Sequence, residues 1–543
     1  MKIGHLIAIF ALAALPFCVA FALYYPDERH YTDGALQMVK GHGWLVPETA
    51  NGGPRLEKPP LAYWLIAACY KIFGVNVFAS RFPFLLAACG TIFLTFRLAR
   101  KLTGKSETAL LAAVVLASQP QFFLCAMRSI PDALLVFFVT LSAFGFLRLM
   151  VFEEFSAGAF LMAYGGATGA ALSKGLLGLL IIVFAWAFCL AKSRNWRAVN
   201  KLIHWPIFLV TMVLAAAWFV YIFCKMPEIA WRQFFGDQVT GNMHGHFWSP
   251  ILRVPLFAGI LLLNFLPWSA TAIEFLFRRK TLENGNISAA GGNFILAWTM
   301  ILILGFSLGA NVSLRYLLPA TPLMAILFAD ILMRAETFQL ILSGGRLLKI
   351  ALSLLAIAAI IVLYAGSQWP LPVFLPYTVC GLIIACVVAL SVAVARKKSF
   401  ALEALGVSIL AAWLLAFFAI MPVAFPDRAQ QIAATLRQNE ISSKRPLLLI
   451  GDLKLASRLR VTLGKDWTVM QTNWLPKDLS QYNAVLISDW NLHLLGETGW
   501  KTQIAAASPA PPSFRKLVNA ILSRHLPQAL APDSDKMILA TRL

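Results

Sequence analysis

Hydrophobic runs separated by short polar segments follow one another along the chain as far as residue 424. Nearly all of them are long enough to cross a bilayer as helices. The thirteen runs are 3–23, 79–97, 107–125, 132–150, 157–173, 176–191, 203–223, 252–276, 292–309, 317–333, 349–366, 373–395 and 402–424. This pattern predicts an α-helical polytopic membrane protein with about thirteen transmembrane helices. Only the pair separated by Lys174 and Gly175 is short.

Two segments near the N-terminus need separate interpretation. After Lys2 the chain continues through about twenty apolar residues, which is longer than the usual apolar core of a cleaved signal peptide. We therefore expect an uncleaved first helix. The stretch 60–74 is shorter, follows a proline pair and contains Lys71, so it predicts an interfacial or re-entrant helix.

The loops alternate between two kinds of charge. Basic loops lie at 97–105, 191–201, 278–280, 334–349 and 395–399, and loops of mixed charge lie at 24–78, 126–131, 224–251, 310–316 and 367–372. Because basic loops stay in the cytoplasm, the N-terminus should be cytoplasmic and the mixed loops should face the opposite side. The net charge of +21 then reflects topology and attraction to the membrane surface, and nucleic acid is not an expected partner.

Composition supports this class and marks a change near residue 425. The chain is 59% hydrophobic and 13% charged, whereas soluble domains carry about 25% charged residues. Residues 426–543 are more polar, with strand-like runs at 446–452, 467–473 and 484–490. We expect a transmembrane domain over 1–425 and a small soluble α/β domain over 426–543, on the non-cytoplasmic side.

The mixed-charge loops carry the candidate chemistry, because they should meet at one membrane surface. Carboxylates such as Asp27 and Asp132 can deprotonate or orient an attacking oxygen. Lysine and arginine side chains can hold a phosphate group as it leaves. Such a surface suits group transfer between amphiphilic substrates. Two simpler interpretations remain open: Asp132 as a helix cap, and 24–78 as a solvated loop that only sets topology.

Several motifs resemble one known family. "PDERHY" (26–31), followed by "LEKPPLAYW" (56–64), is similar to the first periplasmic loop of GT-C glycosyltransferases of the protein O-mannosyltransferase type. Within that type the chain most resembles the bacterial lipid A aminoarabinose transferases. Further matches are Asp132 after Arg128, "LSKGLLGLL" (172–180), "NFLPW" (264–268) and "RYLLPATPLMAIL" (315–327). The resemblance covers most of residues 20–330, and the helix count and outward C-terminal domain agree with it.

The resemblance implies an inverting transfer from a polyprenyl-phosphate-linked sugar, usually undecaprenyl phosphate in bacteria, on the periplasmic face of the inner membrane. It implies that Asp27 is the catalytic base or orients the acceptor, with Glu28 and Asp132 as further catalytic acids. It assigns binding of the donor phosphate to Lys58, Arg315, Tyr316 and Tyr31. It assigns a supporting role to Glu57 and Arg128. It implies no metal and no other cofactor.

Departures from the family pattern concern substrate identity more than reaction class. Leu56 replaces the aromatic residue that commonly precedes "EKPP", and the first loop is about one residue longer than usual. The segment 236–248 keeps a histidine but lacks the acidic-His-x-x-Arg-Phe pattern of the aminoarabinose enzymes. The identity of the substrates therefore stays open. The candidate sugar is 4-amino-4-deoxy-L-arabinose, and the candidate acceptors are lipid A, a protein hydroxyl and another envelope glycan.

Two alternatives of other kinds were weighed. His244 and His246 could bind a metal with Asp237 as third ligand, but two histidines alone are a weak signal. A transporter of lipid-linked sugars would share the basic loops, yet it should place ionisable residues near the membrane midplane. The predicted spans carry few acidic residues there, so the pattern favours an enzyme.

Overall fold

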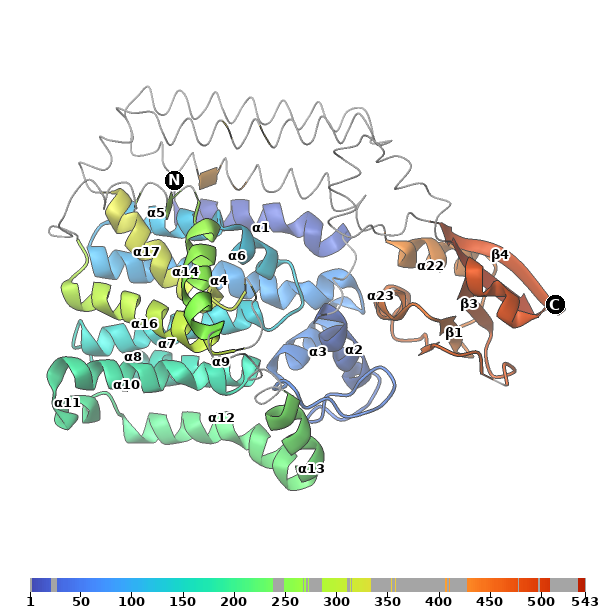
Figure 1. The fold of residues 1–543 in the computed structure, drawn as a ribbon, viewed down its shortest axis with the longest axis horizontal. Coiled ribbons are helices and arrows are strands. Elements are labelled where there is room, and N and C mark those ends of the chain that lie inside the picture. Colours follow the sequence, from blue (N-terminus) through green and yellow to red (C-terminus); the bar gives the residue numbers. More distant parts are fainter. Residues whose placement is uncertain are drawn as a thin grey trace.

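The computed structural model describes residues 2–20, 27–237, 249–266, 286–309, 313, 315–333, 427–476, 478–496, 499–507 and 536–542, with isolated positions between 268 and 272 and between 353 and 410. Within these ranges, long helices run in roughly parallel directions, and a small sheet domain lies beyond one of their ends (Figure 1). The architecture is that of a multi-pass helical membrane protein with a soluble α/β unit.

Helices occupy every predicted span that falls in the described ranges. They are α1 (Ile3–Ala20), α4 (Val77–Thr103), α5 (Ser106–Ala117), α6 (Pro120–Ala126), α7 (Asp132–Met150), α8 (Ala157–Phe160), α9 (Gly166–Lys174), α10 (Leu180–Ser193), α12 (Trp205–Lys225), α14 (Ser249–Asn264), α16 (Ala289–Ser307) and α17 (Thr321–Leu332). Five helices of the described part are long and apolar enough to cross a membrane, or six if α5 and α6 form one span. The predicted spans 349–366, 373–395 and 402–424 lie outside the described ranges, so the count of thirteen stays a prediction.

Two of the predicted spans are irregular. The span at 107–125 is two helices, α5 and α6, which meet at an angle of 72°. The span at 157–173 consists of α8, a π-helical turn (Leu161–Gly165) and α9. It packs closely on α7, because a Cβ added to Gly145 would lie 2.2 Å from the backbone nitrogen of Ala163. Small residues permit this kind of backbone approach between membrane helices.

The segment 24–78, expected as one long loop, contains two helices. Helix α2 (Asp27–Val39) begins at the acidic pair Asp27-Glu28 and buries one side along its length. Acidic residues in a first turn interact favourably with the helix dipole. Helix α3 (Leu61–Phe73) confirms the helix predicted at 60–74, and it packs against α2 and α4.

The C-terminal unit is a five-stranded sheet with helices α22 (Arg428–Gln438) and α23 (Leu453–Leu463). Its strands are β1 (Leu447–Ile450), β2 (Val469–Thr472), β3 (Ala484–Ser488), β4 (Trp500–Ala507) and β5 (Lys536–Arg542), in the spatial order β2-β1-β3-β5-β4. The strands β2, β1 and β3 are parallel, and β5 pairs antiparallel with β3 and β4. The three predicted strand-like runs coincide with β1, β2 and β3.

This sheet domain packs against α2 through α23 (Figure 1). The same end of the helix bundle carries the start of α7 and the end of α9. Several segments that are distant in the sequence therefore meet there, and they bring most of the candidate site residues together.

Candidate functional site

The first turn of α2 is fixed by a buried ion pair. Arg81 of α4 donates from Nε and Nη2 to the two carboxylate oxygens of Glu28, at 2.9 Å and 2.7 Å. The backbone N–H of Ser129 donates to Glu28 Oε1 at 2.7 Å, and Arg81 Nη1 donates to the carbonyl of Phe17 at 2.7 Å. Both partners are almost fully buried. The pair therefore joins α1, α2, α4 and the turn before α7.

This environment changes the role expected for Glu28. The sequence suggested a catalytic acid, but the carboxylate is 0% exposed and both of its oxygens accept hydrogen bonds from protein groups. A group held in this way has no surface for a substrate. This environment favours a positioning role for Glu28, whose catalytic assignment stays a prediction, and the side chain of the neighbouring Asp27 is about one-third exposed.

Asp27 and Asp132 share one arginine. Arg315 Nη1 lies 2.9 Å from Asp27 Oδ2 and 3.8 Å from Asp132 Oδ2. Lys174, at the end of α9, donates to Asp132 Oδ1 at 2.6 Å. The side chains of Asp27 and Arg315 are about one-third exposed, whereas that of Asp132 is nearly buried. The result is a chain of alternating charge that runs from the surface into the protein.

Lys58 adds a third cation to this cluster. Its pKa is lowered to about 8, mainly by burial and then by the nearby charge of Lys174, while Glu57 and Asp132 act in the opposite direction. The pKa of Lys58 therefore depends on the charges of Lys174, Glu57 and Asp132, and a further charged group nearby would change it again. Arg315 contacts both aspartates and Lys174 contacts Asp132, while the charge of Asp132 also acts on Lys58.

The loop that carries Lys58 is held by its own polar contacts. Arg55 Nη2 lies 2.9 Å from Glu57 Oε2. The backbone N–H of Leu56 donates to Gln233 Oε1 at 2.6 Å, and Gln233 donates to the carbonyl of Pro54 at 3.1 Å. These bonds hold the residues on the N-terminal side of Lys58, and the supporting role of Glu57 stays a prediction.

Of the two predicted tyrosines, Tyr31 is buried and Tyr316 is partly exposed. Tyr31 is 6% exposed and lies with its ring 5.1 Å from that of Tyr63. Burial, the largest cause, together with Tyr63, Asp132 and Asp27 raises the pKa of Tyr31 well above its ordinary value. Its hydroxyl therefore stays protonated. Tyr316 stacks on Phe306, with ring centroids 4.9 Å apart.

Two residues of this region, Lys174 and Asp33, have ion-pair partners that the sequence did not reveal. Lys174 was read only as a break between two short spans, although its motif, "LSKGLLGLL", was among the family matches. Asp33, expected to be an ordinary loop charge, pairs with Arg460 of the C-terminal domain. Arg128 lies one residue before the Ser129 N–H that binds Glu28. Its placement fits a supporting role at the turn before α7.

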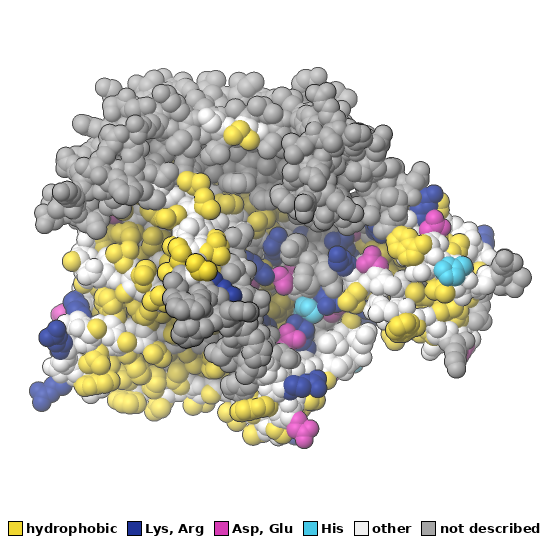
Figure 2. Space-filling view, viewed as in Figure 1, with side chains coloured by type: hydrophobic (Ala, Val, Ile, Leu, Met, Phe, Trp, Pro, Cys, Tyr) yellow, Lys and Arg dark blue, Asp and Glu magenta, His cyan; other side chains and the backbone are white. Residues whose placement is uncertain are grey.

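The surface over these residues is chemically distinct. Figure 2 shows basic, acidic and histidine side chains gathered in a hollow between the hydrophobic surface of the membrane helices and the C-terminal domain.

Burial and the nearby Arg55 and Arg29 lower the pKa of His30 to about 3, so this histidine is neutral. Among the described residues, no group of three histidine, cysteine or acidic side chains could hold a metal. His244 and His246 lie outside those residues.

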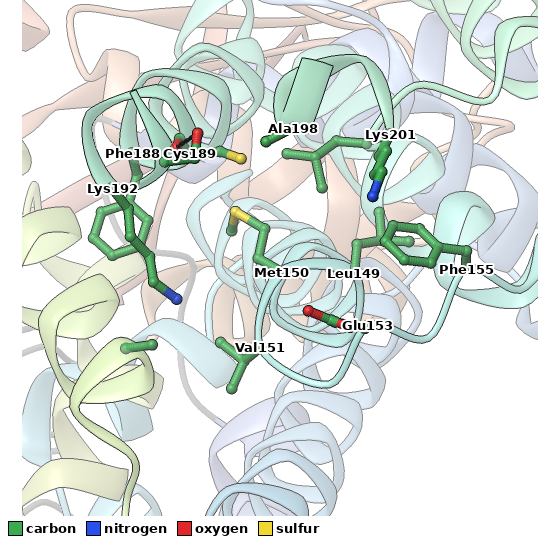
Figure 3. A pocket seen from close by; sticks show the side chains of 13 residues that line it. Leu149, Met150, Val151, Glu153, Phe155, Phe188, Cys189, Lys192, Ala198 and Lys201 are labelled. Atoms are coloured by element: carbon green, nitrogen blue, oxygen red, sulfur yellow. Dashed lines mark hydrogen bonds between the residues drawn. The ribbon is translucent and has the colours of Figure 1, made fainter. Parts of the chain in front are cut away.

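A separate pocket lies at the opposite end of α7. It has a volume of about 280 Å³ and is lined by the last residues of α7 and α10 together with Glu153, Phe155, Lys192 and Lys201 (Figure 3). Asp132 begins α7, whereas this pocket contacts its end at Leu149 and Met150. The pocket therefore belongs to the other side of the helix bundle and is not part of the aspartate–cation cluster.

Comparisons with known proteins agree with this geometry. Residues 57–222 match the family model for dolichyl-phosphate-mannose-protein mannosyltransferase. An uncharacterised protein of Aquifex aeolicus is 30% identical over 60% of this chain and 64% of its own length. The undecaprenyl phosphate-alpha-4-amino-4-deoxy-L-arabinose arabinosyl transferase of Pseudomonas paraeruginosa is 27% identical over 81% of this chain and 82% of its own.

A solved structure has the same fold over almost the whole chain. The crystal structure of ArnT from Cupriavidus metallidurans bound to undecaprenyl phosphate superposes with a TM-score of 0.71, at 18% identity, and covers 99% of this chain and 98% of that one. The chain thus has the fold of this ArnT structure and is similar in sequence to the arabinosyl transferase of Pseudomonas paraeruginosa. These similarities agree with the resemblance to GT-C glycosyltransferases that the motifs indicated.

The positioning role of Glu28 leads to a stability prediction. The change Glu28→Gln leaves Arg81 as a buried charge without its counter-ion, which costs about 3–5 kcal/mol. We expect a clearly lower unfolding temperature in detergent or bilayers. Glu57→Gln is the matched control, because it removes a part-exposed pair worth about 1 kcal/mol or less. Equal unfolding temperatures for the two variants would contradict the assignment.

Proposed function

We propose that the chain transfers a sugar from a polyprenyl-phosphate donor to an acceptor lipid on the periplasmic face of the bacterial inner membrane. The observation that carries this proposal is the cluster in which Arg315 pairs with Asp27 and Asp132, Lys174 pairs with Asp132, and Lys58 is influenced by the charges of Lys174 and Asp132. Three cations against two acids leave a surplus positive charge that suits a phosphate group. The ArnT relative bound to undecaprenyl phosphate supports the choice of donor.

The shared arginine couples donor binding to Asp27. In this structure Arg315 pairs with Asp27 at 2.9 Å. A donor phosphate that binds Lys58 competes for the same guanidinium, because phosphate and carboxylate prefer the same bidentate partner. Drawing Arg315 toward the phosphate releases the Asp27 carboxylate. Asp27 can then accept a hydrogen bond from the attacking acceptor oxygen only once the donor is in place.

The chemical step is a displacement at the anomeric carbon with inversion. The acceptor oxygen forms the new bond to C1, the bond from C1 to the phosphate oxygen breaks, and the polyprenyl phosphate leaves with the bonding electrons. Lys58 and Arg315 stabilise the negative charge that develops on the leaving phosphate. With a hydroxyl acceptor, Asp27 takes its proton. With an acceptor phosphate that is already ionised, Asp27 only orients it.

For the substrates we favour 4-amino-4-deoxy-L-arabinose as sugar and lipid A as acceptor. The name of the Pseudomonas paraeruginosa relative supports the sugar. The family model is named for transfer to protein, which keeps a protein hydroxyl as the second candidate acceptor. Transport of a lipid-linked sugar is the alternative from another class. It would not require paired carboxylates and cations at one surface.

Mass spectrometry of the cell envelope tests this proposal directly. Lipid A and surface proteins are compared between cells that express the wild-type chain, cells that express Asp27→Asn and cells that lack the chain. We expect a pentosamine increment on lipid A only with the wild-type chain. An increment on protein instead would overturn the assignment of lipid A as acceptor. No increment on any envelope component would overturn the proposed transfer reaction.

Two substitutions test the site itself. Asp27→Asn and Lys58→Ala should each lower transfer by about 100-fold or more, which is typical for losing a general base or a charge-stabilising group, while insertion and folding persist. The controls are Asp489→Asn and Lys105→Ala, which remove the same charges from exposed positions elsewhere. Transfer is measured with purified protein and a polyprenyl-phosphate-sugar. Normal turnover by Asp27→Asn would rule out its assignment.

The lowered pKa of Lys58 predicts a basic limit to activity. Lys58 is protonated below a pH of about 8 and neutral above it, so its attraction for the donor phosphate is lost as the pH rises. Because kcat/KM reports groups of the free enzyme, kcat/KM for the donor should fall above pH 8. In Lys58→Arg the charge persists and the fall should shift to higher pH. An unshifted limb in this variant would assign it to another group.

A further inference from the structure

Helix α2 is held at both ends, and the second attachment comes from the soluble domain. Arg460 of α23 donates from Nη1 to Asp33 Oδ2 at 3.0 Å, and both side chains are less than a tenth exposed. Lys40, just after α2, donates to the carbonyl of Trp467 at 2.7 Å. Helices α2 and α23 lie against each other at this junction (Figure 1).

Asp33 depends on Arg460 for its charge. Burial raises the pKa of Asp33, and Arg460 is the main group that lowers it again. The second carboxylate oxygen of Asp33, Oδ1, is buried without a hydrogen-bond partner. Arg460 is itself fixed by a hydrogen bond from Nε to the carbonyl of Val469 at 3.1 Å. Without Arg460, the buried carboxylate would lose the group that most lowers its pKa, and the charge of Arg29 would act on it alone among the cations that lower it now.

The geometry of α2 connects this junction to the site. Asp33 follows Asp27 by six residues, which is about 9 Å along a helix at 1.5 Å per residue. A helix of this length transmits a displacement at one end to the other, since its backbone hydrogen bonds resist bending. Glu28 fixes the first turn against the membrane helices, and Asp33 fixes the next turns against the soluble domain. The direction in which Asp27 points depends on both attachments.

We propose that the C-terminal domain sets the position of Asp27 by clamping α2, with Arg460 as the positioning residue. This inference rests on the proposed role of Asp27 in glycosyl transfer. It assigns to the soluble domain a part in catalysis that involves no contact with substrate. A displacement of about 1 Å at a reacting group can lower a rate by as much as 100-fold, so the loss of one distant arginine is sufficient to matter.

The kinetic test uses Arg460→Met in the full-length protein, reconstituted in lipid bilayers. We expect kcat to fall by about 10- to 100-fold, with the KM for the polyprenyl-phosphate donor changed by less than about twofold. Arg460→Lys retains the charge and should recover part of kcat. The control is Arg437→Met, which removes an exposed arginine from the same domain and should leave both constants unchanged.

A mutant cycle separates positioning from simple destabilisation. If Arg460 acts through Asp33, the double variant Asp33→Asn/Arg460→Met should be no worse in kcat than Arg460→Met alone. Hydrogen exchange over 27–39 should accelerate in Arg460→Met at a temperature where the membrane helices stay protected. If Arg460→Met does not fold, Lys40→Met probes the same junction, and it should lower kcat in the same direction.

Two results would overturn the inference. One is an unchanged kcat in Arg460→Met or Lys40→Met, with α2 exchanging faster than in the wild type. The other is a loss of activity that appears entirely in KM. Asp27→Asn measured in the same assay keeps the two questions apart: if that variant is active, the role of Asp27 fails, and if it is inactive while Arg460→Met is normal, only the clamp fails.

Discussion

The buried pair between Glu28 and Arg81 is the interaction on which the site depends. Two charges removed from water destabilise a fold unless their geometry and remaining hydrogen bonds are satisfied. Here both carboxylate oxygens and the guanidinium have partners from four segments. The pair's hydrogen bonds are directional, whereas most other contacts in the helix bundle are apolar and do not fix an orientation. It fixes the start of α2, and Asp27 consequently lies beside Arg315.

Next to the start of α2, negative and positive side chains alternate in the order Asp27, Arg315, Asp132 and Lys174. Asp132 is saturated by Lys174 at 2.6 Å and lies farther from Arg315, at 3.8 Å. Asp27 has Arg315 at 2.9 Å and is more exposed than Asp132. The two aspartates are therefore not equivalent. Asp132 pairs with its cations at a nearly buried position, whereas the pair of Asp27 with Arg315 is part-exposed, as the proposed exchange of Arg315 between Asp27 and a donor phosphate requires.

The sequence predicted the fold class, and it named candidate reacting groups without revealing which charges pair with one another. Hydropathy locates spans because the bilayer requires long apolar helices, and motif spacing located Asp27 and Lys58. Sequence cannot pair a charge with a distant one: the partner of Glu28 is 53 residues away and that of Asp33 is 427 residues away. Glu28 therefore looked catalytic, Asp33 looked solvated, and Lys174 looked like a boundary between helices.

The two ion pairs that hold α2 differ in a way that bears on function. Glu28 and Arg81 are enclosed by helices of the bundle and have no oxygen to spare, while Asp33 keeps an unpartnered oxygen at a junction between two folded units. An incompletely satisfied pair is the weaker of two otherwise similar contacts. Motion of α2 should then begin at its C-terminal half. The soluble domain contacts that half through Arg460, and Lys40 follows it with a bond to Trp467. We therefore expect the placement of Asp27 to respond to an element that carries none of the candidate site residues.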